Sequence, residues 1–240
     1  MLIGVFQDSH ANLPAFKKAI ELFQQRGCER IIHVGDMVGI GPYPLETLEF
    51  ARSIPNLECI MGNHDHWYAY GLPDPTPAWM SQDEIDHQNW THTQLGDSHK
   101  AWVQSWPFSL NIEGPAGHTI NFRHYALTKD QNWFQPISKE ASAEELDQMF
   151  ADVEADIIFY GHNHIDSDII GNSRYVDLGS TGCYDRPWIR IAVLDLSGEE
   201  PFIQKITSVY EDEGLLQAYD ERQVPARDFI RKVFVSREED

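Results

Sequence analysis

Residues 59–67 read CIMGNHDHW. A short apolar run is followed by a glycine, and then Asn63, His64, Asp65 and His66 stand in a row. Four polar side chains directly after a segment that resembles a buried strand cost free energy unless they bind something. The row raises the question of which side chains bind a metal, which act chemically and which are only neighbours.

The segments before this stretch alternate between strand and helix patterns. Apolar runs at 2–6, 30–34 and 57–61 are typical of buried strands. Apolar residues recur at helical spacing after Asn12, a candidate helix cap, and 44–54 form a second helical pattern. Strands that alternate with helices in this way predict βαβ units with parallel pairing.

The downstream part of the chain predicts a hairpin at 108–124 and further strands, with two helices in the tail. The strands are expected at 156–160, 174–178, 189–196 and 202–210, and the last two should pair antiparallel. The tail helices are expected at 214–222 and 226–235. We interpret 1–240 as a single α/β domain with a helical tail over about 212–240.

An insert over about 66–121 interrupts the alternation. After a loop rich in Pro and Gly, it holds two helical patterns, at 81–95 and 97–106. It is also rich in tryptophan: Trp67, Trp79, Trp90, Trp102 and Trp106. Two interpretations of the insert stay open. It is either a lid that recognises the substrate's leaving group or a pair of helices packed over one sheet edge.

Chemically active side chains follow the expected strands, one set after another. They are Asp8 and His10, Asp36, Asn63 and His64, His124, and His162 and His164. In open α/β sheets ligands bind at the carboxyl ends of the strands, so these side chains are expected on one rim. A single His after a strand is usually structural, but a full series of this kind is not explained by structure alone.

Imidazole, carboxylate and amide oxygen in this number suit two metal ions, of Mn, Fe, Zn, Co or Ni, and ligand type does not choose among them. Two cations about 4 Å apart repel and need an anionic bridge, which a carboxylate or a hydroxide provides. A hydroxide between two cations can attack phosphorus in line while the cations hold the phosphoryl oxygens. A single zinc site would need only three or four of these ligands.

The composition disfavours some classes of binding partner and favours one type of cellular compartment. The 240 residues include 18 Lys and Arg against 38 Asp and Glu, a net charge of −20, which disfavours broad binding to nucleic acid or anionic membranes. The three cysteines lie far apart and form no CxxC motif, so neither a zinc knuckle nor a disulfide framework is expected. Cys28 and Cys59 lie beside apolar runs, which favours small core residues in a reducing compartment. No apolar run is long enough to span a membrane, and we expect a cytoplasmic protein of undetermined oligomeric state.

From residue 2 to about 196 the sequence resembles the calcineurin-like metallophosphoesterase superfamily. The resemblance rests on five blocks: DSH, GDMVG, GNHD, the isolated His124, and GHNH. DSHANLPA, GDMVGIGPYP and LGSTG further resemble the bacterial branch of small phosphodiesterases, protein-phosphatase-like enzymes and diadenosine tetraphosphatase-like proteins. The resemblance implies a four-layer αββα sandwich of two mixed sheets flanked by helices, with a helical insert after the third strand.

The resemblance also implies a role for each matching residue. The first metal would be bound by Asp8, His10 and His164. The second would be bound by Asn63, His124 and His162, with Asp36 as the bridging carboxylate. His64 would face the substrate and either stabilise charge or protonate the leaving oxygen, and Asp65 would orient His64.

For three further residues the sequence leaves two possible roles. Tyr125 either stacks on an aromatic group of the substrate or packs as a strand residue. Arg186 either clamps a phosphate or forms an ion pair on the strand face. His118 competes with His124 as a ligand, but it follows the GPAG turn and should lie at the opposite end of its strand.

The leading functional hypothesis is a metal-dependent phosphoester hydrolase. Its substrate would be a small or protein-bound phosphomonoester, a phosphodiester or a dinucleoside polyphosphate. The alternative is a binding scaffold of the same fold that has lost catalysis, for which a retromer subunit of the superfamily is the precedent. Metal-assisted amide hydrolysis would need similar ligands, but the order of the blocks disfavours it.

Overall fold

The computed structural model describes residues 1–130 and 133–235. Its strands are β1 (Leu2–Phe6), β2 (Arg30–His33), β3 (Leu57–Cys59), β4 (Ser109–Glu113), β5 (Thr119–Arg123), β6 (Ile157–Tyr160), β7 (Asp166–Ile170), β8 (Arg174–Leu178), β9 (Trp188–Asp195) and β10 (Phe202–Val209). Its helices are α1 (Leu13–Gln25), α2 (Pro44–Arg52), α3 (Asn63–Tyr70), α4 (Gln82–Leu95), α5 (Lys100–Gln104), α6 (Ala143–Met149), α7 (Leu215–Glu221) and α8 (Arg227–Phe234). A short 3₁₀ turn, η1 (Pro115–Gly117), joins β4 to β5.

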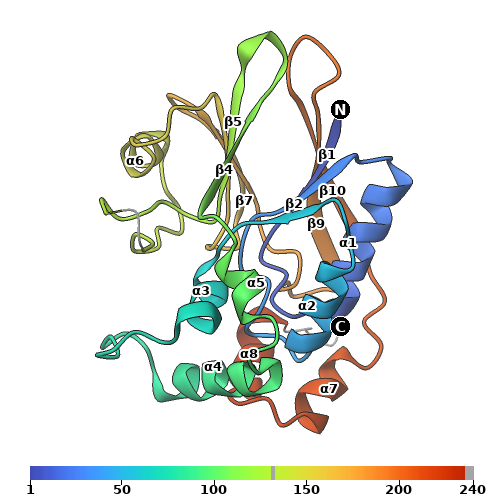
Figure 1. Cartoon of the computed structure of the whole chain (residues 1–240), viewed down its shortest axis with the longest axis vertical. Coiled ribbons are helices and arrows are strands. Elements are labelled where there is room, and N and C mark those ends of the chain that lie inside the picture. The colour runs from blue at the N-terminus through green and yellow to red at the C-terminus, as the bar shows by residue number, and fades with distance from the viewer. Residues whose placement is uncertain (131–132, 236–240) are drawn as a thin grey trace.

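Within the described residues the strands form two mixed five-stranded sheets that lie face to face (Figure 1). In the first sheet, of order β10-β9-β1-β2-β3, the strands β1 to β3 run parallel, β9 pairs antiparallel with β1, and β10 pairs antiparallel with β9. In the second, of order β4-β5-β6-β8-β7, three parallel strands lie between two antiparallel edge strands. The predicted antiparallel pair at 189–196 and 202–210 is confirmed.

The main core lies between the two sheets. Ile3, Val5 and Ile32 from the first sheet meet Phe122 and Phe159 from the second, and all five are buried. Each such side chain contributes roughly 1.5–3 kcal/mol when it leaves water. Helices α1 and α2 cover the outer face of the first sheet and α6 that of the second (Figure 1). The expected four-layer αββα sandwich is confirmed.

Helix α1 forms as its sequence predicts. The Asn12 side chain accepts a hydrogen bond from the Ala15 amide at 3.2 Å, Pro14 lies in the first turn, and Phe16 and Phe23 are buried. A cap of this kind stabilises a helix by about 1 kcal/mol. Because α1 begins at Leu13, the loop between β1 and α1 is short and holds Asp8 and His10 close to the strand end.

Four elements differ from the sequence predictions. The third strand ends at Cys59, and α3 begins at Asn63, so the polar row occupies the first turn of a helix. The edge strand β7 and the short helix α6 were not predicted. β7 alternates between exposed and half-buried residues, so it lacks the apolar run by which the other strands are recognised.

The insert and the tail gather at one end of the molecule. Helices α3, α4, α5, α7 and α8 lie in the lower half of Figure 1, whereas the β4–β5 turn is at the upper end. The predicted insert helices correspond to α4 and α5, and the predicted tail helices to α7 and α8. Over residues 1–130 and 133–235, no helix combines the length and apolar character that a membrane crossing requires.

Candidate metal centre

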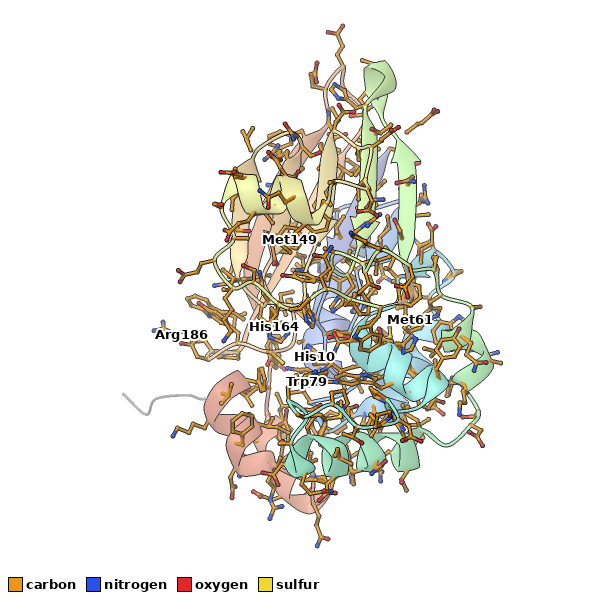
Figure 2. All side chains as sticks on the ribbon, turned by 90° about the vertical axis from the view of Figure 1, so that its left-hand side faces the viewer. His10, Met61, Trp79, Met149, His164 and Arg186 are labelled. Atoms are coloured by element: carbon orange, nitrogen blue, oxygen red, sulfur yellow. The ribbon has the colours of Figure 1, made fainter. Side chains whose placement is uncertain are left out.

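The residues expected to bind metal gather on one rim, where five strands of the two sheets end. Asp8 and His10 follow β1, Asp36 follows β2, Asn63 follows β3, His124 follows β5, and His162 and His164 follow β6. Parallel strands bring their carboxyl ends to one edge, and the two edges meet because the sheets face each other. Figure 2 shows His10 and His164, which come from different sheets, lying near each other.

Asp8, His10 and His164 form the first group. The Nε2 atoms of His10 and His164 are 2.9 Å apart. Asp8 Oδ1 lies 3.7 Å from the first of these nitrogens and 3.5 Å from the second. Two ring nitrogens this close share at most one proton, and a cation bound by all three atoms would satisfy both of them.

Asn63, His124 and His162 form the second group. Asn63 Oδ1 lies 3.2 Å from His124 Nε2, and the ring centres of His124 and His162 are 5.2 Å apart. The Nδ1–H of His124 donates to the Val34 carbonyl at 3.0 Å, because a carbonyl can only accept. This bond leaves Nε2 facing the rim as a potential ligand atom.

Asp36 stands between the two groups. Its Oδ2 lies 3.9 Å from His10 Nε2, in the first group, and 3.3 Å from His124 Nε2, in the second. Its Oδ1 accepts the backbone N–H of His64 at 2.9 Å. A carboxylate in this place is within reach of a cation in either group, as the predicted bridging role requires.

The local backbone and the buried oxygens fit the binding of cations. Asp8 Oδ1 is buried and has no hydrogen-bond partner among the residues that the structure describes. Five of the seven side chains come from residues with left-handed backbone: Asp8, His10, Asp36, His162 and His164. Such conformations cost free energy for residues other than glycine, and they are retained mainly where a functional site requires them.

The charges of the site also fit the binding of cations. Burial lowers the pKa of His124, but the adjacent Asp36 carboxylate outweighs it and raises that pKa to about 10. In the protein alone a proton on His124 thus balances the charge of Asp36. A cation would supply the same balance and free Nε2 to bind it. Burial lowers the pKa of His162 to about 3, so this ring is neutral and ready to act as a ligand.

His64 is held by the insert. Its Nδ1 lies 2.7 Å from Gln88 Nε2 on α4, and the same amide nitrogen donates to Glu84 at 2.6 Å. A carboxylate accepts only, so Glu84 fixes the orientation of the amide; Gln88 then donates to Nδ1, and the ring proton lies on Nε2. Gly39 leaves room for this arrangement, because a Cβ there would lie 2.3 Å from His64 Nδ1.

Asp65 has a different role from the one expected. Its Oδ2 accepts the backbone N–H groups of Asp36 and Gly62, at 2.8 and 3.1 Å, and its Oδ1 accepts those of Met37 and Val38, at 3.0 and 3.2 Å. Asp65 therefore holds the loop that carries Asp36. It does not orient His64 directly, because both of its oxygens are engaged by the backbone.

Tyr125 and Arg186 do not line the rim as substrate-binding residues would. Tyr125 is buried, its hydroxyl accepts the Ser138 amide at 2.7 Å, and its ring centre lies 4.9 Å from that of His162. This geometry favours the packing alternative, with Tyr125 supporting His162 from behind. Arg186 is exposed and stacks on Trp188, and Figure 2 shows it farther out than His164.

His118 lies at the opposite end of its strand, as expected, and pairs with Glu200 at 2.7 Å. Sequence reasoning missed two residues near the metal groups, Gln88 and Cys183. Cys183 offers a sulfur within 4.8 Å of the ring nitrogens of His10 and His164, but burial raises the pKa of its thiol, which disfavours the thiolate that binds metal. The strand-end position after LGSTG was the available signal for Cys183, whereas no local motif marks Gln88.

Comparisons with known proteins show similarity to one family of phosphoesterases. The sequence model of the calcineurin-like phosphoesterase superfamily domain matches residues 1–199. An uncharacterized protein of Methanocaldococcus jannaschii is 27% identical over 172 residues, which cover 68% of this chain and 63% of that protein. A phosphodiesterase of the same organism is 37% identical over 65 residues, 27% of this chain and 37% of that enzyme. The match thus spans less than two thirds of either relative.

Two solved structures share the fold over nearly the whole chain. A hypothetical protein of Pyrococcus horikoshii OT3 has a TM-score of 0.79 at 17% identity, covering 99% of each chain. A metallophosphoesterase from Sphaerobacter thermophilus has a TM-score of 0.66 at 21% identity, covering 94% of this chain and 95% of that one. At such identities these likenesses establish the architecture and leave the activity open. Since the family's sequence model extends over the first 199 residues and the two-sheet architecture agrees with it, this chain belongs to the calcineurin-like phosphoesterase superfamily.

Proposed function

We propose that the protein is a metal-dependent phosphoester hydrolase with two cations at the rim. The observation that carries the proposal is the position of Asp36 Oδ2, 3.9 Å from a nitrogen of the first group and 3.3 Å from a nitrogen of the second. Asp8, His10 and His164 would bind one cation; Asn63, His124 and His162 would bind the other. When bound, the cations supply the positive charge that polarises the phosphoryl group and makes water nucleophilic near neutral pH.

The chain's own residues would carry the remaining steps. His64 presents Nε2–H, which is suited to donate to the ester oxygen as the P–O bond breaks. One water is consumed, and its hydroxyl forms the new bond to phosphorus while a proton goes to the leaving oxygen. Asp65 keeps Asp36 in place through the backbone of the loop, so it acts on the reaction through positioning.

The proposed substrate is a small or protein-bound phosphate ester or a dinucleoside polyphosphate. A net charge of −20 disfavours long nucleic acid, whereas cations at the rim reverse the sign of the charge locally. The family relationship and a partial match to an archaeal phosphodiesterase support a phosphoesterase activity.

The test combines metal analysis with three assays. Purified protein is analysed for bound metals, loaded with Mn, and assayed with p-nitrophenyl phosphate, bis(p-nitrophenyl) phosphate and diadenosine tetraphosphate. Hydrolysis of any one that is lost on chelation and restored by metal supports the proposal. Full metal occupancy without hydrolysis of any of the three would overturn it and favour the non-catalytic scaffold.

A further inference from the structure

A pocket beside the metal centre is not explained by metal binding or by phosphate chemistry. Its volume is about 550 Å³, and Asn63 and His162 form part of its wall. The rest of the wall comes from two distant segments, Trp67 and Trp79 in the insert and 133–137 in the loop after β5. Pockets of this size and apolar character are typical of sites for small organic groups.

The walls of this pocket are largely aromatic. The ring centres of Trp67 and Trp79 are 6.4 Å apart with an angle of 34° between the planes, and those of Trp67 and Trp133 are 6.2 Å apart at 35°. Phe134 completes the set and is buried. None of the described lining residues is Asp, Glu, Lys or Arg, so the pocket favours an uncharged flat group over a peptide rich in charge.

The pocket is fixed to the ligand residues themselves. Trp67 lies one turn after Asn63 on α3, and its ring centre is 4.9 Å from that of His64. Phe134 stacks on His162, with ring centres 6.3 Å apart and planes at 18°. A group in the pocket therefore lies next to a phosphate held at the rim.

One further feature of the pocket bears on its occupant. Trp79 is 65% exposed, so its ring stands at the open side of the pocket, where stacking on a ligand would cover it. Figure 2 shows Trp79 in the central part of the molecule, in the same region of the view as His10 and His164.

We propose that this aromatic pocket binds a planar aromatic group attached to the phosphate of the substrate, such as a nucleobase or an aryl ring. The inference rests on the proposed function, since it assigns the substrate class of the same centre. Among the substrates considered above, it favours small aromatic esters and nucleotides over phosphoproteins. Tryptophan rings stack on any base or aryl face, which explains a preference for aromatic groups without selection of one base.

The experiment uses two matched ligand pairs on the metal-loaded protein. Phenylphosphonate and methylphosphonate differ in the ring alone and resist hydrolysis, and AMP and ribose 5-phosphate differ in the base alone. Calorimetry with the phosphonates and inhibition constants for all four give the aromatic preference. We expect at least about a tenfold preference for the aromatic member in one or both pairs. A preference in the AMP pair alone identifies a nucleobase, and a preference in both pairs identifies aromatic rings in general.

Trp79→Ala is the test variant, because Trp79 is exposed and its removal leaves the core intact. It should lower the aromatic preference at least about fivefold while the affinity for methylphosphonate stays unchanged. Trp79→Phe should restore most of the preference. Trp90→Ala, a change of the same residue type on α4 outside the pocket, should leave the preference unchanged.

Equal affinity within both pairs, or an equal loss for both members in Trp79→Ala, would overturn the aromatic site. Its failure is separable from failure of the proposed function. Ester hydrolysis without aromatic preference overturns only the pocket assignment, whereas absence of all hydrolysis at full metal occupancy overturns the function beneath it.

Discussion

The rim and the insert meet at the same place but are built in different ways. Each expected ligand on the rim follows a strand within a few residues, so its position is set by short local segments. The insert reaches the rim through tertiary packing: Gln88 contacts His64 across 24 residues of chain, and Trp79 lies opposite a loop more than 50 residues away. The insert holds His64 through Gln88. In the proposed function, the rim would determine the type of chemistry and the insert would determine which esters fit.

Asp36→Asn should have the largest effect, because it acts where the two groups of the rim meet. The amide can still accept the His64 N–H through one oxygen, but it presents N–H donors to the nitrogens that Oδ2 now faces. We expect a loss of phosphoesterase activity of more than about 100-fold together with reduced metal content. Parallel metal analysis and kinetics on the purified variant would measure both.

Asp97→Asn, the same chemical change at an exposed position in the insert, is the matched control and should leave activity and metal content unchanged. If Asp36→Asn keeps its activity and two metals per chain, the Asp36 carboxylate does not bridge two cations, and the proposed role of the rim is wrong.

The rim could be predicted from the sequence because each of its residues follows a strand within a short local segment. The order of most elements, the pairing of β9 with β10 and the gathering of the seven candidate ligands on one rim all follow from local patterns and their spacing. The start of α3 at Asn63, the edge strand β7 and the loop-anchoring role of Asp65 could not be predicted, because propensity and polarity alone do not reveal which backbone amides a carboxylate will meet. Gln88 was missed for the same reason, since the docking of α4 is decided by packing.

Gln88→Met tests whether the insert acts on the chemistry. Methionine keeps the length of the side chain but removes the donor to His64 Nδ1, so the ring proton is no longer confined to Nε2. We expect turnover to fall about tenfold with phenyl phosphate and less with p-nitrophenyl phosphate, whose leaving group needs less protonation. The Michaelis constant should change little, because the substrate's phosphate is held elsewhere.

Two controls separate positioning from packing. Gln94→Met, on the exposed side of the same helix, should be neutral. In a His64→Ala background, Gln88→Met should cause no additional loss. A further loss there, or an equal loss with both leaving groups, would show that Gln88 acts only through the packing of α4.

Acid should loosen the insert before it loosens α1. His87 on α4 accepts the Ile40 N–H at 2.7 Å, and burial lowers its pKa to about 4, below the ordinary value of about 6.5. A folded-state pKa below the unfolded one means that stability is complete above pH 6.5 and falls as the pH drops toward 4. The slope is at most about 1.4 kcal/mol per pH unit for this histidine.

Hydrogen exchange, corrected for intrinsic rates, would measure this at pH 7 and pH 5 on peptides from α4 and α1. Peptides from α4 should lose protection first, and His87→Gln, which keeps an acceptor but does not titrate, should remove much of the difference. Equal loss in both helices would show that acid acts on the whole domain and that the insert has no separate sensitivity.

The smallest effect concerns left-handed backbone outside the rim. Ala116, in the β4–β5 turn at the opposite end of the molecule, has φ 53° and is exposed, and Gly117 beside it has φ 84° with open space around the position of a Cβ. Ala116→Gly should raise the free energy of unfolding by up to ~1 kcal/mol, and Gly117→Ala should lower it by a similar amount. Urea unfolding would measure both, and activity should not change in either variant, because the turn lies far from the rim.

If Ala116→Gly instead lowers stability, left-handed backbone in this protein is not strained where it carries no ligand. The same conformation at Asp8, His10 and Asp36 would then no longer be evidence that the rim maintains strain for the sake of metal binding.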